Sequence, residues 1–128
     1  MISKNTDLGL LLLRLSTGGL MLFHGVSKLI HGISFLVENM GAFGYAVYIG
    51  EVLAPIAILL GFRTRIAAVL LAITCVVAVA TAHAQEIFSI SEHGGYALEL
   101  LMLYFLGALA LFFTGAGKFA VSKNNQWD

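Results

Sequence analysis

Charge is scarce in this sequence. Only 11% of its 128 residues are Asp, Glu, Lys or Arg, and the seven basic side chains balance the seven acidic ones. A chain with no excess of basic residues and no basic run lacks the positive surface that nucleic-acid binding requires. We therefore expect no nucleic-acid partner.

Cysteine is nearly absent as well. The single cysteine, Cys75, lies within an apolar run, so the chain forms neither an internal disulfide nor a CxxC redox pair. A cleavable signal peptide is not predicted either, because the first apolar run leads into His24 and Lys28 and lacks a small-residue cleavage site. We expect thiol-disulfide exchange to be excluded and residue 1 to belong to the mature protein.

Apolar residues are abundant, at 59% of the chain, and they gather in long runs. A membrane helix needs roughly 20 such residues, since each adds about 1.5 Å across a hydrocarbon core about 30 Å thick. Four runs qualify, at about residues 8–29, 43–62, 66–85 and 96–113. Helices satisfy their own backbone in lipid. The sequence therefore predicts an all-α, integral membrane four-helix bundle in a lipid bilayer, with residues 1–128 as one domain.

The two ends of the predicted bundle differ in charge. One end has five basic residues, namely Lys4, Arg63, Arg65, Lys118 and Lys123. The opposite end has only Lys28, together with three glutamates. Because basic loops tend to stay inside, both termini are predicted to lie in the cytoplasm and the loops after the first and third runs outside.

The first outer loop contains a helical pattern of its own. Its apolar residues recur with the spacing of one helical face, at Ile33, Leu36, Val37 and Met40. This pattern predicts a short interfacial helix on the outer surface.

Ionisable side chains inside the apolar runs are the main functional signal. Such groups cost at least about 2.5 kcal/mol near the membrane centre and normally face the bundle interior or a cavity. All four runs contribute at least one to the predicted outer half of the membrane, at His24, Lys28, Glu51, His83 and Glu99. Together with Arg14, which lies about 15 Å deeper than His24 on the helical rise, these residues form the candidate ligand-binding set.

The first run carries a narrow stripe of polar and small residues. At about 100° per residue, the members of this stripe fall within about 40° of one line, and they are Arg14, Gly18, Met21, Gly25 and Lys28. The two glycines predict close approach of a neighbouring helix or a flat ligand.

The second run contains the only proline of the chain, Pro55. Proline has no N–H, so it cannot bond the carbonyl four residues earlier, which belongs to Glu51. We expect a kink and a free carbonyl beside the Glu51 side chain, which a lined cavity tolerates.

Each of these residues also has a structural interpretation. In that interpretation, the Lys28 side chain extends to the outer headgroups. The Arg14 side chain extends to the inner headgroups or pairs with a glutamate. His24 and His83 donate hydrogen bonds to backbone carbonyls, and ion pairs between the helices serve only to hold the bundle together. The similar depth of ionisable groups in all four runs is what favours a shared site.

Three chemistries fit that site. A quinone headgroup needs hydrogen-bond donors and a proton route, which histidine, lysine and carboxylate supply. A metal would use His24, His83, Glu51 and Glu99, although no EXXH or HEXXH spacing supports it. The helices are long enough for His24 and His83 to hold a b-type haem between them, but no sequence motif requires a haem. No residue is assigned as catalytic.

The order of these motifs resembles one family of small membrane proteins. "LLLRLSTGGLMLFHGVSKL" is similar to the opening of DoxX-family proteins, and "GEVLAPIAILLGFRTRIAAVLLAI" to their glutamate-bearing second span and following turn. The likeness continues through His83, Glu99 and the "TGAG" at residues 114–117. It does not extend to Glu92, His93 or the tail "KNNQWD".

The resemblance implies a four-helix bundle in the bacterial inner membrane. It also implies redox work, as a subunit of a quinone-linked oxidoreductase or as a membrane partner of enzymes that handle oxidative and thiol stress. We expect an accessory or quinone-binding subunit with a redox partner or a second copy of itself, since the chain has no cofactor-binding domain. The alternatives are a non-catalytic assembly protein, a small-solute or proton carrier, and a haem or metal protein. Whether the chain is itself an enzyme stays open.

Overall fold

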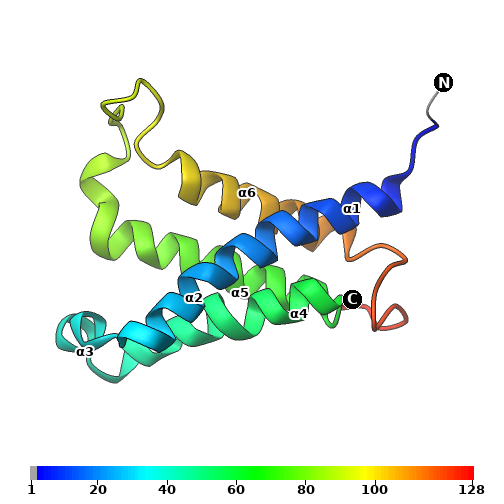
Figure 1. The fold of residues 1–128 in the computed structure, drawn as a ribbon, viewed down its shortest axis with the longest axis horizontal. Helices are drawn as coiled ribbons and strands as arrows, with labels where there is room; N and C mark the ends of the chain where they lie inside the picture. Colours follow the sequence, from blue (N-terminus) through cyan, green and yellow to red (C-terminus); the bar gives the residue numbers. More distant parts are fainter. Residues whose placement is uncertain (1–2) are drawn as a thin grey trace.

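The computed structural model describes residues 3–128. Over that range the chain is helix and loop, with no β-strand and one isolated bridge between Ile90 and Tyr96. The prediction of an all-α chain is confirmed for these residues. The longer helices run roughly along one direction, and the start of the first helix lies at the same end of the molecule as the C-terminus (Figure 1).

The first helical rod is straight and long. Helix α1 (Thr6–Arg14) and helix α2 (Leu20–His31) are joined by a π-helical segment, Leu15–Gly19, and together they span 26 residues. The rod begins where the Asn5 side chain accepts a hydrogen bond from the Leu8 N–H at 3.0 Å, a helix N-cap. It ends at Gly32, whose φ of 81° suits glycine.

The second helical region is broken. Helix α3 (Ser34–Met40) continues into a 3₁₀ segment, Gly41–Ala46, which is bent by 54° from the following π-helical segment, Ile49–Leu53, and helix α4 (Ala54–Leu60). The predicted helix over residues 33–40 is confirmed, and its predicted apolar face is the face turned inward: Ile33 is buried, and Leu36, Val37 and Met40 are half-buried.

The remaining two helices pack against each other along their length. Helix α5 (Thr64–Ala78) continues through a π-helical segment, Val79–His83, and a 3₁₀ turn, Ala84–Glu86, to give 23 helical residues. Helix α6 is Glu99–Thr114. It starts three residues later than the sequence predicts, because the backbone of residues 89–97 forms a turn around the Ile90–Tyr96 bridge.

The lengths of the helices decide how many reach across a bilayer. Thr6–His31 and Thr64–Glu86 are each long and apolar enough to cross, and the bent pair Ser34–Ala46 and Ile49–Leu60 counts as a third span if taken together. Helix α6 is an apolar helix of 16 residues, which falls short of the roughly 20 that a full crossing needs. The four-span count therefore stays a prediction.

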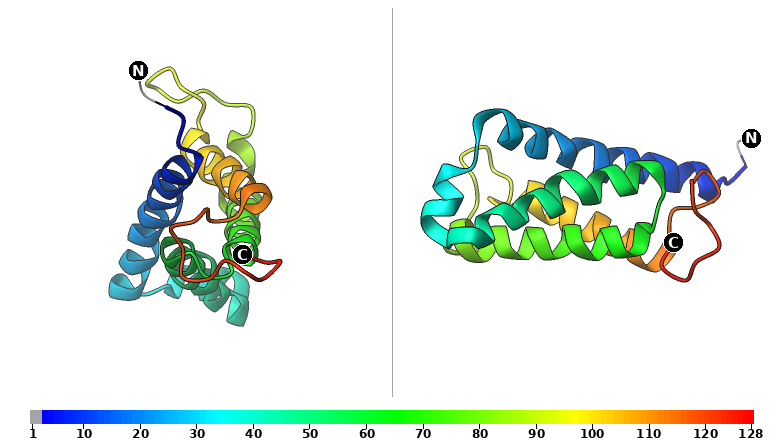
Figure 2. Two further views of the ribbon diagram at one scale, coloured as in Figure 1. Left: turned by 90° about the vertical axis from the view of Figure 1, so that its right-hand side faces the viewer. Right: turned by 90° about the horizontal axis from the view of Figure 1, so that it is seen from below.

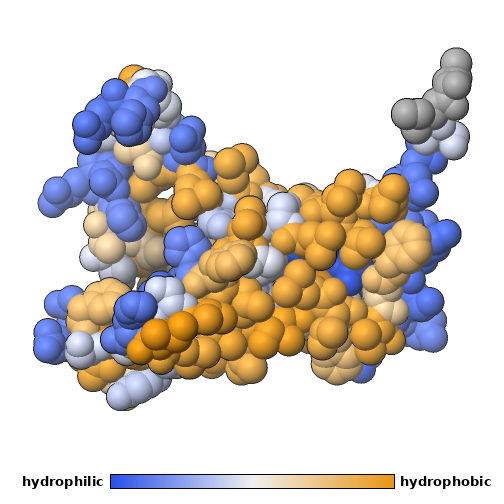
Figure 3. All heavy atoms as spheres, viewed as in Figure 1, coloured by the Kyte–Doolittle hydropathy of each residue, from blue (hydrophilic) through white to orange (hydrophobic). Residues whose placement is uncertain are grey.

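A core of buried apolar side chains, alanines among them, holds the helices together. It lies where α2, α4, α5 and α6 meet, and its members include Met21, Ala54, Ile58, Ala68, Leu71, Tyr104, Ala108 and Leu111. Large apolar side chains are also exposed on the outside, and Figure 3 shows them as a belt between two hydrophilic ends. A belt of this size suits lipid and not water, which confirms the bilayer as the surroundings.

The C-terminal residues 115–128 form no helix and lie across one end of the helices (Figure 2). They are tied to the turn between α4 and α5 by backbone hydrogen bonds, from the Val121 N–H to the Leu60 carbonyl and from the Ser122 N–H to the Gly61 carbonyl. The end opposite to this tail is covered in part by α3 (Figure 2).

Candidate functional site

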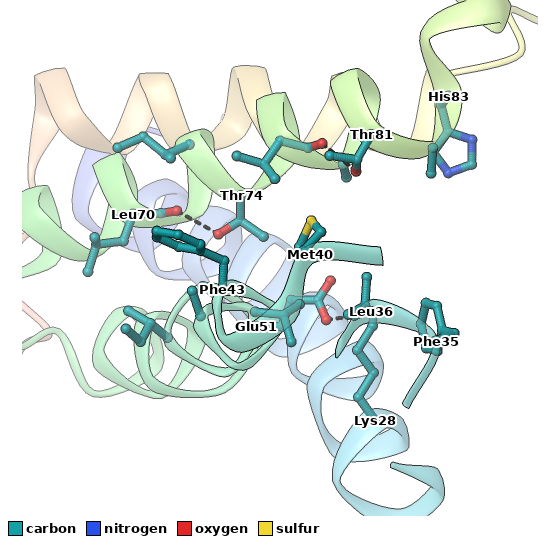
Figure 4. A pocket seen from close by; sticks show the side chains of 18 residues that line it. Lys28, Phe35, Leu36, Met40, Phe43, Glu51, Leu70, Thr74, Thr81 and His83 are labelled. Atoms are coloured by element: carbon teal, nitrogen blue, oxygen red, sulfur yellow. Dashed lines mark hydrogen bonds and ion pairs between the residues drawn. The ribbon is translucent and has the colours of Figure 1, made fainter. Parts of the chain in front are cut away.

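A cavity of about 370 Å³ lies between the α3 region and helix α5. Figure 4 shows side chains from both sides converging on it. The wall is mostly apolar, formed by Phe35, Leu36, Met40, Phe43, Ala46, Val47, Ile49, Gly50, Leu70, Ile73, Val77, Ala78 and Ala82. Five polar or charged residues complete it, namely Lys28, Glu51, Thr74, Thr81 and His83. This combination of apolar walls and few polar groups is typical of sites for small organic molecules.

The cavity owes its shape to the bend between Ala46 and Ile49, which separates the α3 region from the helix that includes α4. The 54° bend turns the α3 region away from the axis of α4 and towards α5. On the α5 side, Ala78 and Ala82 leave room that larger side chains would fill. The apolar face of α3 thus serves as a wall of the cavity, through Leu36 and Met40.

An ion pair marks the charged part of the wall. The Lys28 ammonium lies 2.6 Å from Glu51 Oε2, and the two side chains are 23% and 11% exposed. A pair so little exposed is a poor source of stability in general, because both charges lose most of their water. This pair is one of the interhelical ion pairs expected under the structural interpretation of these charges.

The backbone around Glu51 explains how the carboxylate is placed. Glu51 lies in the π-helical segment that ends just before Pro55, and an added Cβ on Gly25 would overlap the Glu51 carbonyl oxygen. On the other side, an added Cβ on Gly50 would overlap the Thr74 hydroxyl. Two glycines therefore let α2 and α5 close on this segment from both sides. The predicted close approach at Gly25 is confirmed, and the carbonyl that meets it is the one that Pro55 cannot bond.

The two threonines of the wall are already satisfied as donors. Thr74 Oγ1 donates to the Leu70 carbonyl and Thr81 Oγ1 to the Val77 carbonyl, both at 2.8 Å. Hydroxyls that bond back along their own helix keep only their acceptor capacity for a ligand. Donors to a ligand in this cavity must come from Lys28 and His83.

His83 is the last residue of the π-helical segment that extends α5. Its Nδ1 lies 2.7 Å from Glu86 Oε2, and both side chains are nearly half exposed. The contact with Glu86 involves the Nδ1 atom of the ring and does not involve Nε2. A carboxylate beside one ring nitrogen orients the imidazole and fixes the role of the other nitrogen.

Three predicted site residues do not line the cavity. His24 is exposed on α2, with its ring edge-on to Tyr104 at a centroid separation of 6.0 Å, and Glu99 is exposed at the start of α6. Arg14 lies near the other end of the first rod. Within residues 3–128, the four candidate metal ligands do not gather, and no three His, Cys, Asp or Glu side chains form a metal-like cluster.

Arg14 is the most buried charged side chain, at 1% exposure. Its guanidinium donates hydrogen bonds of 2.5 to 3.2 Å to four backbone carbonyls, those of Ile58, Leu59, Ala116 and Phe119. Two of these carbonyls end α4 and two belong to the C-terminal tail. Arg14 therefore joins the last turn of α4 to the tail, where orphan carbonyls need donors.

Two further arginines hold the tail, to which the sequence motifs assign no role. Arg63 Nη1 lies 2.9 Å from Asp128 Oδ1, and Arg65 donates to the carbonyls of Phe112 and Gln126 at 2.7 Å each. Burial alone raises the pKa of Asp128, but hydrogen bonds from Ser122 and the Asn125 N–H, with the hydrogen bond and charge of Arg63, outweigh it and lower that pKa from 3.8 to about 2.

Comparison with known proteins identifies the family. The family model described as DoxX matches residues 9–84, more than half of the chain. The chain belongs to the DoxX family. The matched residues include Arg14, His24, Lys28, Glu51 and His83, so the ion pair and His83 lie within the DoxX region, and Glu99 and the tail lie beyond it.

One relative of this chain is named as an oxidoreductase. The chain is 29% identical over 109 residues to the Bacillus subtilis (strain 168) protein named "Putative oxidoreductase CatD", covering 80% of this chain and 81% of that protein. No solved structure matches this chain. The membership in the DoxX family and the apolar helices together indicate a membrane protein.

Proposed function

We propose that this DoxX protein binds a quinone headgroup in the cavity between α3 and α5 and works as the membrane subunit of an oxidoreductase assembly. The observation that carries the proposal is the cavity itself. It is apolar enough for a flat ring and holds the Lys28–Glu51 pair and His83 in its wall. Its volume of about 370 Å³ lies in the range of small-molecule sites.

The chemistry of a quinone matches these donors. A quinone presents two carbonyl oxygens that accept hydrogen bonds, and its reduction to a quinol takes up two electrons and two protons. The Lys28 ammonium has three N–H donors, and its bond to Glu51 occupies one of them. Lys28 and His83 would each donate a hydrogen bond to one ring oxygen, and the Glu51 carboxylate would hold the Lys28 ammonium in place. The two protons of the quinol would come from water through these two side chains, since His83 is nearly half exposed.

The electrons must come from elsewhere in such an assembly. The described residues form no cofactor-binding domain, and apolar side chains fill the space between their helices. A partner protein with its own redox group would therefore deliver the two electrons. Arg14, His24 and Glu99 have no direct contact with the quinone in this proposal, because none of them lines the cavity.

The proposed arrangement in the bacterial inner membrane follows the charge of the two ends. The bent pair and α6 would serve as the second and fourth spans, which makes four in all. The end with the arginine-held tail would face the cytoplasm, because it collects most of the basic residues. The cavity would then open near the outer leaflet.

Quinone binding to the purified protein in neutral detergent tests the proposal. Equilibrium dialysis with a short-chain quinone gives the dissociation constant for the wild type and for Lys28→Ala and His83→Ala. Each variant removes one proposed hydrogen bond, so each is expected to weaken binding by about fivefold to tenfold. His31→Ala, at an exposed histidine outside the cavity, is the matched control and should bind as the wild type does.

A steric variant gives an independent test. Ala78→Leu adds three carbons inside the cavity, whereas Ala80→Leu adds the same three on an exposed position of the same helix. We expect binding to be lost in the first variant and kept in the second. Equal binding by both variants would place the quinone elsewhere and remove the basis of the proposal.

Membrane orientation is tested by cysteine labelling in intact bacteria. On a Cys75→Ala background, Glu92→Cys should react with a membrane-impermeant maleimide and Asn124→Cys should not. Both positions are exposed in the structure, so a difference in labelling reports the side of the membrane. The reverse pattern would invert the proposed topology.

A further inference from the structure

A second hollow lies at the end of the molecule that carries the tail. Its volume is about 480 Å³, and it is lined by the end of α6, the glycine-containing turn that follows, and the tail. Three of its lining residues are basic, Arg65, Lys118 and Lys123, and one is acidic, Asp128. Unlike the cavity beside α3, this hollow is mostly polar.

The acidic residue does not cancel the basic ones. The Asp128 carboxylate already accepts hydrogen bonds from Arg63, Ser122 and the Asn125 N–H, and its charge is balanced by Arg63 at 2.9 Å. The Asp7 carboxylate accepts the Lys118 backbone N–H at 3.0 Å, but among residues 3–128 no carboxylate lies within ion-pair distance of the Lys118 or Lys123 ammonium. One further acidic group thus faces three basic ones. The hollow therefore keeps a net positive charge.

Arg65 gives the hollow a fixed donor. Its Nε donates to the Phe112 carbonyl, its Nη1 donates to the Gln126 carbonyl, and the guanidinium lies 4.9 Å from the centre of the Phe112 ring. These contacts use Nε and Nη1 and leave Nη2 out. A guanidinium held on a ring and on two carbonyls loses little freedom when it binds an anion.

The rim of the hollow places it at a lipid boundary. Phe113 lines it and is 78% exposed, next to the apolar belt, and Trp127 in the tail is 43% exposed. Exposed aromatic side chains beside charged ones are typical of the level of the lipid headgroups. An anion that enters here would meet basic groups on one side and hydrocarbon on the other.

We propose that this hollow binds a phosphate group, with Arg65, Lys118 and Lys123 as its ligands. The chemistry fits the phosphate of an anionic phospholipid and also a free phosphate anion, because both offer acceptor oxygens to clustered basic side chains. The inference is independent of quinone binding, which uses other residues at the other end of the helices.

Lipid retention by the purified protein tests this site. The protein is mixed with phosphatidylglycerol or phosphatidylcholine in neutral detergent micelles, and bound lipid is counted by native mass spectrometry. We expect the wild type to retain phosphatidylglycerol at least tenfold better, and the double variant Lys118→Ala/Lys123→Ala to lose roughly tenfold of that preference. Raising the salt from 0.1 M to 0.5 M should weaken retention, because the Debye screening length of the solution falls by about half.

Matched controls separate the site from general surface charge. Lys4→Ala removes an exposed lysine outside the hollow and should keep the preference, and Lys118→Arg/Lys123→Arg should restore what the alanine variant loses. A preference that inorganic phosphate abolishes would assign the site to a soluble phosphate anion, and one that phosphate leaves intact would assign it to the lipid. Equal retention of the two lipids, or the same loss in Lys4→Ala, would overturn the proposal.

Discussion

Replacing Arg14 should release the C-terminal tail from the helices. Arg14 is almost completely buried, and its guanidinium is bonded to carbonyls of α4 and of the tail. Arg14→Met keeps an unbranched apolar stem and removes every donor. Arg14→Lys keeps the charge, but its ammonium is too compact to reach carbonyls on both elements.

The size of the effect follows from the hydrogen bonds. Arg14 donates to four carbonyls, two in the last turn of α4 and two in the tail. A net value of about 1 kcal/mol for each bond, which allows for water reaching the partly buried carbonyls, gives a loss of about 4 kcal/mol in the free energy of unfolding. We expect Arg14→Lys to lose about half as much.

Trp127 makes the assay specific for the tail. It is the only tryptophan, it lies in the tail, and its carbonyl accepts a hydrogen bond from the Arg65 N–H at 2.9 Å. Denaturant titration in mixed micelles, followed by tryptophan emission, should show a lower midpoint and a red-shifted starting emission for Arg14→Met. Lys4→Ala is the control at the same end of the molecule. Wild-type emission and stability in Arg14→Met, with quinone binding lost, would refute this reasoning and give Arg14 a ligand-binding role.

Three further predictions concern packing and pH. Gly25→Ala should lower the free energy of unfolding by about 1–3 kcal/mol because its Cβ would overlap the Glu51 carbonyl, whereas Gly9→Ala, with nothing within 4 Å, should be neutral or slightly stabilising in the same thermal unfolding assay. Thr64→Val should raise the unfolding midpoint, because the buried Thr64 hydroxyl has no hydrogen-bond partner among residues 3–128; a lower midpoint would show that the hydroxyl is satisfied. The pKa of Asp128 is lowered from 3.8 to about 2, so its contribution to stability is complete above pH 3.8 and is lost as the pH falls towards 2; Trp127 emission should shift in that window, and Asp128→Asn should abolish the shift.

Helix-scale features could be predicted because they depend on local pattern. The stripe on the first run is the buried face of the first rod, with Arg14, Gly18, Met21 and Gly25 buried and Lys28 half-buried. Gly25 marked the contact at Glu51, because a missing side chain permits close approach whatever the distant residues are. The kink expected at Pro55 was wrong in its place, because Ile49–Leu60 is one helix and the 54° bend precedes it. The α3 helix followed from its apolar spacing.

Contacts that depend on tertiary structure could not be predicted in this way. The acceptors of Arg14 are backbone carbonyls, two of them more than 100 residues away in the chain, and a carbonyl leaves no mark in the sequence. Lys28 and Glu51, which the sequence places at similar positions along their helices, do meet. The position of a residue along its helix does not determine which way its side chain points, however. His24 and Glu99 lie at exposed positions that do not line the cavity. The π-helical segments before Pro55 and at His83 also have no sequence signal that we could use.

Photoaffinity labelling with an azidoquinone tests most directly whether the cavity beside α3 is a quinone site. The purified protein is irradiated with the probe, digested, and mapped by mass spectrometry. Adducts should lie within residues 35–51 and 70–83, the two stretches that contribute most of the cavity wall, and an excess of unlabelled quinone should suppress them. Adducts confined to α1 or to α6, or adducts that unlabelled quinone leaves unchanged, would contradict a quinone site in this cavity.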